Sequence, residues 1–358
     1  MSLFRRTQHV LSFGTVVARL LRKETPLSFA REASFQQTMT QDLTFRLAQS
    51  SDIDKILKLS EGLYNGGDYL PARFHTWMKM ENLYVMLAFS GDKLVSLVVS
   101  SIVDGGMTVV DRASRTLPEV RGRGIVAQLA QAMHAFVRKK HPSVHRRRFV
   151  RDKDRDPSAK WKTVVRREKL CCYVEKAILR SVRSQPNAII NSVEVESCPK
   201  DYLCDVVFSP PVRQKLFPDN VIFVDSGFPI EPLRSNVDYL MQEIGDSVYF
   251  AVDKSPDDAL PRSVSFGVLS RRVKFMCWAT SIYSSDPVLY QAHLVHQFKC
   301  ACEVIKGDFM FQSYHDLGFT NCGKIAMEEL LKAKLEEEIT QNFEYLFEEK
   351  LPARHSCL

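Results

Sequence analysis

The residues Arg121-Gly122-Arg123-Gly124-Ile125-Val126 combine two glycines and two arginines at the start of a helical pattern. An alternating run from Met107 to Leu117 precedes them, so the expected order is strand, glycine turn, helix. Such a turn leaves backbone N–H groups free at a helix N-terminus, where an anion binds well. Glycine permits close backbone approach and positive φ, and arginine adds positive charge. The pattern predicts a phosphate or pyrophosphate site; the alternative is a plain strand-to-helix turn.

A second group of chemically capable residues lies between Tyr64 and Pro71, a stretch that contains Gly66, Gly67, Asp68 and Tyr69. The glycines and the proline interrupt a helical pattern and predict a loop. A carboxylate there can hold an amine or an imidazole, and a tyrosine can stack on one. The alternative for Asp68 is structural, because aspartate commonly closes a turn through its own backbone.

These residues must be positioned by the surrounding strands and helices. Alternating or apolar runs predict strands, and apolar spacings of three and four predict helices. The first half of the chain predicts strands over 43–48, 84–89, 93–103, 107–117, 145–150 and 170–179, and helices over 53–63, 72–80, 125–137 and 156–167. This order indicates an α/β protein with helices packed on one mixed sheet.

The second half repeats the strand-turn-strand-helix order without a glycine loop of its own. It predicts strands near 221–224, 247–252, 263–268, 276–281 and 308–311, and helices over 287–305, 314–319 and 324–350. Ser184-Gln185-Pro186-Asn187 is the best linker. We therefore expect an N-terminal extension over 1–41, a first domain over 42–183, a second over 187–335, and an acidic helical tail over 336–358.

Composition limits the possible locations and partners. The nine cysteines show no CxxC spacing, which indicates reduced thiols in an intracellular protein and no metal site. No apolar run is long enough to insert in a membrane. Residues 1–41 are basic and amphipathic, as in a mitochondrial presequence, or are a disordered extension of a cytoplasmic protein. The net charge of +7 is concentrated between Arg138 and Lys169, but few aromatic residues accompany it, so nucleic acid is not an expected partner.

The run Thr116-Leu117-Pro118-Glu119-Val120-Arg121-Gly122-Arg123-Gly124 resembles the acetyl-CoA signature of the GNAT acetyltransferase superfamily. Together with the loop 63–71 and Lys140-His141-Pro142, it resembles most closely the histidine N-acetyltransferase group. The resemblance implies a GNAT fold followed by a degenerate GNAT-like domain that packs on the first and shapes the acceptor pocket. It implies that Thr116 and Leu117 lie beside the pantetheine arm and that a backbone N–H near Leu117 stabilises an oxyanion. It implies that the pyrophosphate is held by the amides of Arg121, Gly122, Arg123, Gly124, Ile125 and Val126. It also implies that the acceptor is contacted by Tyr64, Asp68 and Tyr69.

The expected activity is transfer of an acetyl group from acetyl-CoA, the cosubstrate, to the α-amine of a free amino acid within a ternary complex. L-histidine is the leading acceptor. Two features depart from the family: Arg112 stands where a glutamate base is expected, and Trp161 where a tyrosine acid is expected. Asp111 and Tyr173 are the remaining catalytic candidates, and Asp111 and Arg112 should face opposite sides of their strand. The alternatives are an inactive acyl-CoA-binding or interaction protein and an acetyltransferase for another small amine. The sequence does not indicate the oligomeric state.

Overall fold

The computed structural model describes residues 43–152, 161–175, 193–225, 227–254, 260–336 and 343–352. The predicted presequence, the linker 184–187 and the start of the predicted helix 156–167 lie outside these ranges. The larger elements of the first half are β1 Leu43–Leu47, α2 Ile53–Ser60, α3 Leu70–Trp77, β2 Leu83–Ser90, β3 Lys93–Val103, β4 Thr108–Thr116, α4 Ile125–Lys140, β5 Arg146–Arg151 and β6 Lys162–Val174. Those of the second half are β7 Val195–Ser197, α6 Lys200–Tyr202, α7 Pro210–Leu216, β8 Ile222–Val224, β9 Phe228–Ile230, α8 Arg234–Ile244, β10 Val248–Asp253, β11 Ser263–Arg271, β12 Met276–Ser284, α9 Pro287–Val304, β13 Phe309–His315, α10 Thr320–Ile325 and β14 Phe343–Lys350.

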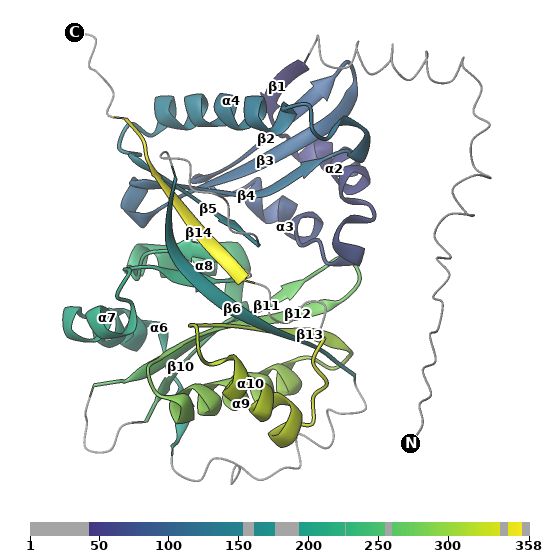
Figure 1. Cartoon of the computed structure of the whole chain (residues 1–358). Helices are drawn as coiled ribbons and strands as arrows, with labels where there is room; N and C mark the ends of the chain where they lie inside the picture. The colour runs from purple at the N-terminus through teal and green to yellow at the C-terminus, as the bar shows by residue number, and fades with distance from the viewer. Residues whose placement is uncertain are drawn as a thin grey trace, which may run out of the picture.

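One twelve-stranded sheet joins the two halves of the chain (Figure 1). Its order is β1-β2-β3-β4-β5-β14-β6-β13-β12-β11-β10-β7. The C-terminal strand β14 pairs with β5 and β6 of the first half, and β6 in turn pairs with β13 of the second half. Each half therefore completes its sheet with a strand that belongs to the other half in sequence. The predicted mixed α/β fold is confirmed.

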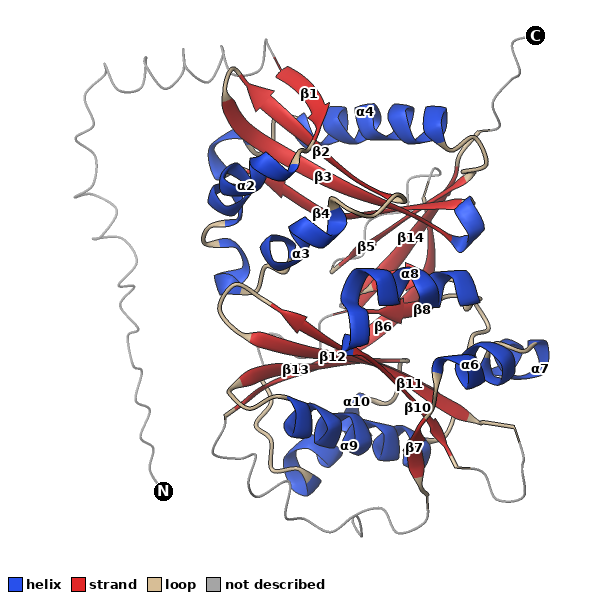
Figure 2. Ribbon diagram, turned by 180° about the vertical axis from the view of Figure 1, so that it is seen from behind, coloured by secondary structure: helices blue, strands red, loops and turns tan. Residues whose placement is uncertain are grey.

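Helices cover both faces of this sheet (Figure 2). On the first half, α4 packs on one face through Ile125, Leu129, Met133 and Val137, which are fully or almost fully buried. The opposite face forms one apolar cluster that includes residues of α2, α3, α8, β10 and β11, so it crosses from one half to the other. Helix α9 is buried against the second half of the sheet, as its continuous apolar sequence predicts. The described part of the chain contains no helix that is both long and apolar enough to cross a membrane.

Three predicted helices are wrong where the structure describes them. The predicted acidic helical tail contains the strand β14, in which Tyr345, Leu346 and Phe347 are buried. Residues 162–167, predicted as the end of a helix, begin the strand β6. The predicted helix over 314–319 is replaced by the end of the strand β13, which includes Tyr314 and His315, whereas the strand predicted over 308–311 is confirmed as the start of β13. In each case pairing with a strand distant in sequence determines the conformation, because local propensity is weaker than burial in a sheet.

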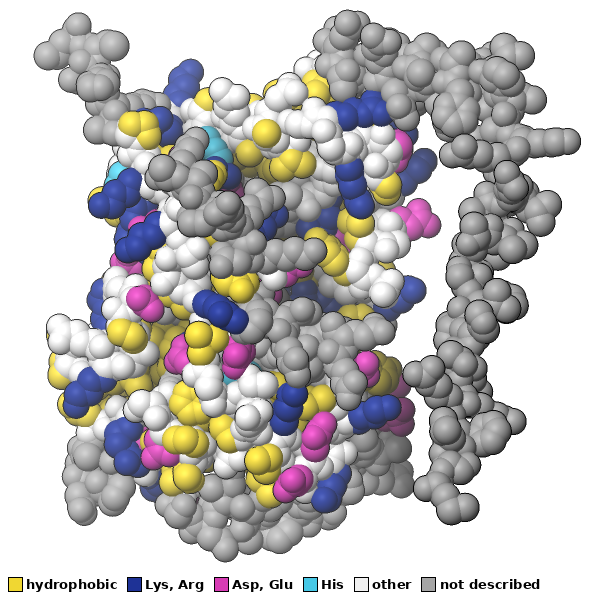
Figure 3. Space-filling model, viewed as in Figure 1, with side chains coloured by type: hydrophobic (Ala, Val, Ile, Leu, Met, Phe, Trp, Pro, Cys, Tyr) yellow, Lys and Arg dark blue, Asp and Glu magenta, His cyan; other side chains and the backbone are white. Residues whose placement is uncertain are grey.

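The basic block Arg146-Arg147-Arg148 lies inside the protein and is paired with acids. Arg148 Nε donates to Glu348 at 2.8 Å and its NH1 group to Asp104 at 3.0 Å. Arg147 NH1 lies 3.4 Å from Glu349. The strand β14 thus neutralises the arginines of β5, and on the face in Figure 3 the Lys and Arg side chains are interspersed with acids.

Candidate functional site

Strands β4 and β5 part at the centre of the first half. Their parallel register runs from Thr108↔Arg146 to Asp111↔Phe149, whereas β4 continues to Thr116. A β-bulge lies just beyond the fork, where Ala113 and Ser114 together oppose one residue of β3 and Ala113 has φ of 52°. A bulge bends and twists a strand away from its neighbour. The fork leaves the β5 side of residues 112–116 without a strand partner, so an extended ligand with amide groups has backbone groups to bond.

The glycine loop connects the end of β4 to α4. Gly122 has φ of 77° and Gly124, the residue before the helix, has φ of 75°. A β-carbon on either glycine would meet nothing within 4 Å, so the loop is open on that side. No side chain caps α4, and the first N–H groups of a helix have no partner within it. The loop thus keeps amide donors available beside two positive-φ glycines, as an anion site requires.

Two cavities meet at this fork. One, of about 560 Å³, is lined by Thr116, Arg121, Gly122, Gly124, Ile125 and Val126, and none of its lining residues is acidic. The other, of about 550 Å³, extends between the two halves of the chain. Both are lined by Tyr64, Ser114, Arg115, Val126 and Arg151, so the two cavities adjoin, and together we call them the channel.

The structure places six of the eight predicted cofactor residues around the loop cavity. Leu117 and Arg123 do not line it. The Leu117 N–H donates to the Val95 carbonyl at 3.0 Å, so it is not available as the expected oxyanion donor. Arg121 Nε donates to the Thr116 carbonyl at 3.1 Å, which holds the loop against the end of β4.

Tyr64, Asp68 and Tyr69, the predicted acceptor residues, have different surroundings. Tyr64 lines both cavities, and Tyr69 lines the one between the two halves. Asp68 is fully buried and does not line either cavity: it accepts hydrogen bonds from Arg115 at 2.7 and 2.9 Å and from the Leu70 N–H at 3.0 Å. The structure therefore corrects the role of Asp68 from acceptor ligand to anchor, because its oxygens bind the loop to β4.

The predicted catalytic residues are also constrained by their partners. Asp111 lines the cavity between the two halves, but its oxygens bind Ser100 at 2.7 Å, Arg147 at 2.6 Å and His134 at 2.8 Å. Burial opposes its ionisation, yet the His134 hydrogen bond and the positive charges nearby outweigh burial and hold the Asp111 pKa below its ordinary value. A low-pKa carboxylate engaged on both oxygens is a poor proton acceptor.

Tyr173 lies away from the channel and donates a hydrogen bond to Asp308 at 3.2 Å, so the structure does not support a catalytic role for it. Arg112 points to the other face of β4 from Asp111, as alternation predicts, and donates to Glu243 at 2.6 Å. Trp161 packs edge-on against Phe149, with ring centroids 4.6 Å apart.

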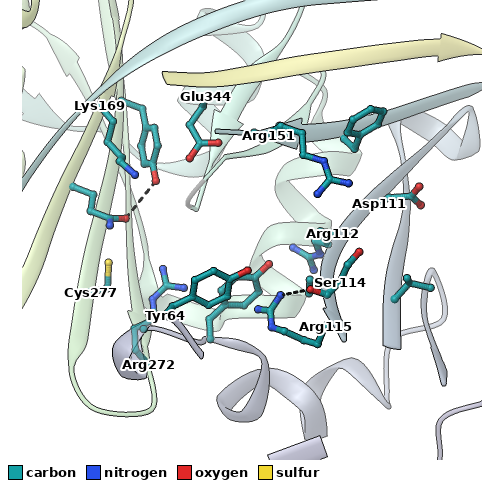
Figure 4. A pocket seen from close by; sticks show the side chains of 18 of the residues that line it. Tyr64, Asp111, Arg112, Ser114, Arg115, Arg151, Lys169, Arg272, Cys277 and Glu344 are labelled. Atoms are coloured by element: carbon teal, nitrogen blue, oxygen red, sulfur yellow. Dashed lines mark hydrogen bonds between the residues drawn. The ribbon is translucent and has the colours of Figure 1, made fainter. Parts of the chain in front are cut away.

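The second half of the chain supplies the far wall of the cavity between the two halves (Figure 4). The turn between β11 and β12 docks on the loop 63–70, where Lys274 N–H donates to Gly66 O at 3.0 Å and Val273 N–H to Asp68 O at 3.1 Å. This contact brings Arg272, Phe275 and Cys277 to the cavity, and other strands contribute Lys169, Met310, Gln312, Tyr314 and Glu344. The sequence analysis did not select these residues, because no local pattern marks them.

The N-terminus of α9, which corresponds in the second half to that of α4, is closed by its own side chain. The Asp286 carboxylate accepts from Val288 N–H at 2.7 Å and from Leu289 N–H at 3.4 Å. It takes the place that a phosphate would need and would repel one. The channel of the first half is therefore the candidate cofactor site.

Comparison with known proteins relates this architecture to one superfamily. Residues 191–316 match the family described as histidine N-acetyltransferase, C-terminal. The chain is 24% identical to histidine N-acetyltransferase of Scomber australasicus over 84% of this chain and 93% of that protein. In solved structures, it is similar to a tandem GNAT protein of clavulanic acid biosynthesis, with a TM-score of 0.50, 10% identity, and 86% and 98% of the two chains covered. The chain therefore has the GNAT fold, and its sequence is similar to those of the histidine N-acetyltransferases.

Two further comparisons define how far this relationship extends. A human protein named probable N-acetyltransferase 16 is 26% identical, and the match spans 58% of each chain. Yeast N-myristoyltransferase with bound myristoyl-CoA has a TM-score of 0.51 at 10% identity, covering 87% of this chain and 79% of that one. The similarity to solved structures of this fold thus extends over both halves of the chain, and the glycine loop lies in the first half.

Proposed function

We propose that this protein is an N-acetyltransferase that transfers an acetyl group from acetyl-CoA to the amine of a free amino acid. The observation that carries the proposal is that the cavity at the open glycine loop adjoins the cavity between the two halves, with five lining residues in common. The basic loop cavity fits a pyrophosphate: the amides at Gly122, Gly124 and the start of α4 would hold it, with Arg121 adding charge. The fork between β4 and β5 would hold the pantetheine arm.

The cavity between the two halves supports an amino acid as the acceptor. Its lining includes Arg151, Lys169 and Arg272, and a carboxylate is the group that such cations bind. Arg272 is almost fully buried, with 6% of its surface exposed. Tyr64, Tyr69 and Phe275 provide aromatic surface for a side chain. Histidine is the leading acceptor because it is in the names of several relatives.

The chain's contribution to transfer is positioning. Holding an amine and a thioester in line converts a bimolecular reaction into one within a complex. When acetyl-CoA is bound, the amine nitrogen bonds to the acyl carbon, the carbon–sulfur bond breaks and the thiol leaves. The rival function is a non-catalytic acyl-CoA-binding protein, favoured by Arg112, which stands on β4 where the family has an acid and is paired with Glu243.

Thiol release from acetyl-CoA, measured with a panel of amino acids and with amines that lack a carboxylate, tests the proposal. We expect release with amino acids and not with the simple amines. Gly124→Asp places a carboxylate beside the pyrophosphate and should abolish acetyl-CoA binding, whereas Gly91→Asp, also at a positive-φ glycine but not in the lining of either cavity, should not. Tight acetyl-CoA binding without thiol release on any amine would establish the rival function.

A further inference from the structure

The C-terminal strand β14 brings one acid, Glu344, to the centre of the channel. Glu344 lines the cavity between the two halves and also a smaller one of about 140 Å³ beside Asp225, Gly227 and Phe228. In Figure 4 its carboxylate points into the cavity between the two halves, with Lys169 to its left and Arg151 to its right. Glu344 and Asp111 are the two acids that line this cavity, and Asp111 is held by Arg147 and His134.

The Glu344 carboxylate differs from the neighbouring buried acids in its partners. Asp225 pairs with Arg73, and Glu243 accepts hydrogen bonds from Trp77 and Arg112. No described residue hydrogen-bonds to the Glu344 side chain or lies within ion-pair distance of it. Gly227 leaves room for it: a β-carbon there would lie 3.4 Å from Glu344 Oε2, and the φ of Gly227 is +92°. A carboxylate that is partly buried, directed into a cavity and free of partners is available to a ligand.

The charges around Glu344 are mixed. The charge of Lys169 on β6 lowers the Glu344 pKa, and the charge of Asp152, just after β5, raises it. Tyr314 on β13 and Asp225 also face this region, and Arg151 and Arg272 line the same cavity as Glu344. Burial is the largest effect and raises the pKa of Glu344 to about 7. A base is most effective when its pKa is near the working pH, so this environment suits proton transfer at neutral pH.

We propose, on the basis of the function proposed above, that Glu344 binds the ammonium group of the acceptor and takes its proton. In this step the N–H bond of the ammonium breaks and the proton moves to the Glu344 carboxylate, which later releases it to water. The neutral nitrogen then forms the bond to the acyl carbon as the carbon–sulfur bond breaks, and the second amine proton goes to the departing thiolate. The nearby cations favour the neutral amine over the ammonium.

The test compares Glu344→Gln, Glu344→Asp and Glu348→Gln. Glu348 lies on the same strand with its carboxylate on Arg148 and does not line the channel, which makes it the matched control. Glu344→Gln should reduce kcat/KM by about 10²–10⁴-fold, the usual contribution of a general base, and leave acetyl-CoA affinity unchanged. Glu344→Asp should keep part of the activity and the acidic limb of the pH profile, whereas Glu348→Gln should behave as the wild type.

A second measurement does not depend on turnover. In the free protein labelled with ¹³C at the glutamate carboxyls, one resonance should titrate near pH 7 and be absent from Glu344→Gln. The assignment of Glu344 would be overturned if Glu344→Gln had the same kcat/KM and pH profile as the wild type, or if Glu344 titrated near the ordinary glutamate pKa. In either case thiol release by the wild type would still support the acetyltransferase. Absence of thiol release by the wild type with every amine would overturn both.

Discussion

The Asp68–Arg115 pair decides whether the loop 63–70 acts through structure or through substrate contact. Both side chains are buried, with 0% and 4% exposed, and two hydrogen bonds of 2.7 and 2.9 Å join them. Asp68→Asn keeps the shape but removes the charge, which leaves the Arg115 guanidinium buried without a counter-ion. Breaking a buried pair from one side costs about 3–5 kcal/mol, and we expect the lower end because the amide oxygen still accepts one bond.

Urea unfolding measures this loss as a fall in the transition midpoint at constant slope. Burial by itself raises the Asp68 pKa, but the Arg115 hydrogen bonds and charge outweigh burial and lower it. The stability from this pair is therefore present at neutral pH and decreases as the pH falls below the ordinary aspartate pKa. Arg115→Met in the Asp68→Asn background removes the unpaired charge and should recover part of the lost stability.

The opposite pattern would refute this reasoning. An unchanged unfolding midpoint in Asp68→Asn, combined with a higher KM for the acceptor at unchanged kcat, would mean that Asp68 holds the substrate and not the loop. Acetyl-CoA binding serves as the check on folding, since a variant that binds the cofactor with wild-type affinity retains the first half of the sheet.

Three other predictions concern single positions. Glu344→Gln should be more stable than the wild type at pH 8, by at most about 3 kcal/mol, but not at pH 4. The reason is that folding raises the Glu344 pKa from 4.5 to about 7, so the stability of the wild type falls as the pH rises between those values; thermal unfolding at pH 4 and pH 8 checks this. Asp286→Ala should destabilise the protein by about 1 kcal/mol in urea unfolding through loss of the α9 cap, and acetyl-CoA affinity measured by calorimetry should not change. Gly227→Ala should lower kcat/KM even at temperatures where the variant stays folded, since its methyl group would press on Glu344 from a positive-φ position. A normal kcat/KM would contradict the placement of that carboxylate.

Much of the first half could be predicted from sequence because its signals are local. The apolar run in 93–103 identifies β3, the alternation in 107–117 identifies β4, and the glycines before Ile125 mark the start of α4. The fork between β4 and β5 follows from no such pattern. It depends on the bulge at Ala113 and on a parallel register that ends at Asp111, and both arise from packing against β3 and β5.

The candidate acceptor pocket was harder to predict, because its walls come from distant parts of the chain. Arg272 reaches the cavity through a turn that docks on Gly66 and Asp68, and the turn itself has an ordinary sequence. Asp68 was assigned to the acceptor on the basis of family resemblance, whereas its partner Arg115 becomes visible only when the loop is folded against β4.

The sequence by itself determined the glycine loop, the helix it begins and the two-fold repetition of α/β elements, because these depend on backbone freedom and on the period of neighbouring side chains. Tertiary structure alone decided the place of the C-terminal segment. Its acids favour an exposed helix when considered alone. In the structure Glu348 instead accepts a hydrogen bond from Arg148, 200 positions away, and Tyr345 and Phe347 of the same strand are buried in the sheet. Pairing between two halves of a chain has no local signature, and this pairing brings Glu344 into the channel.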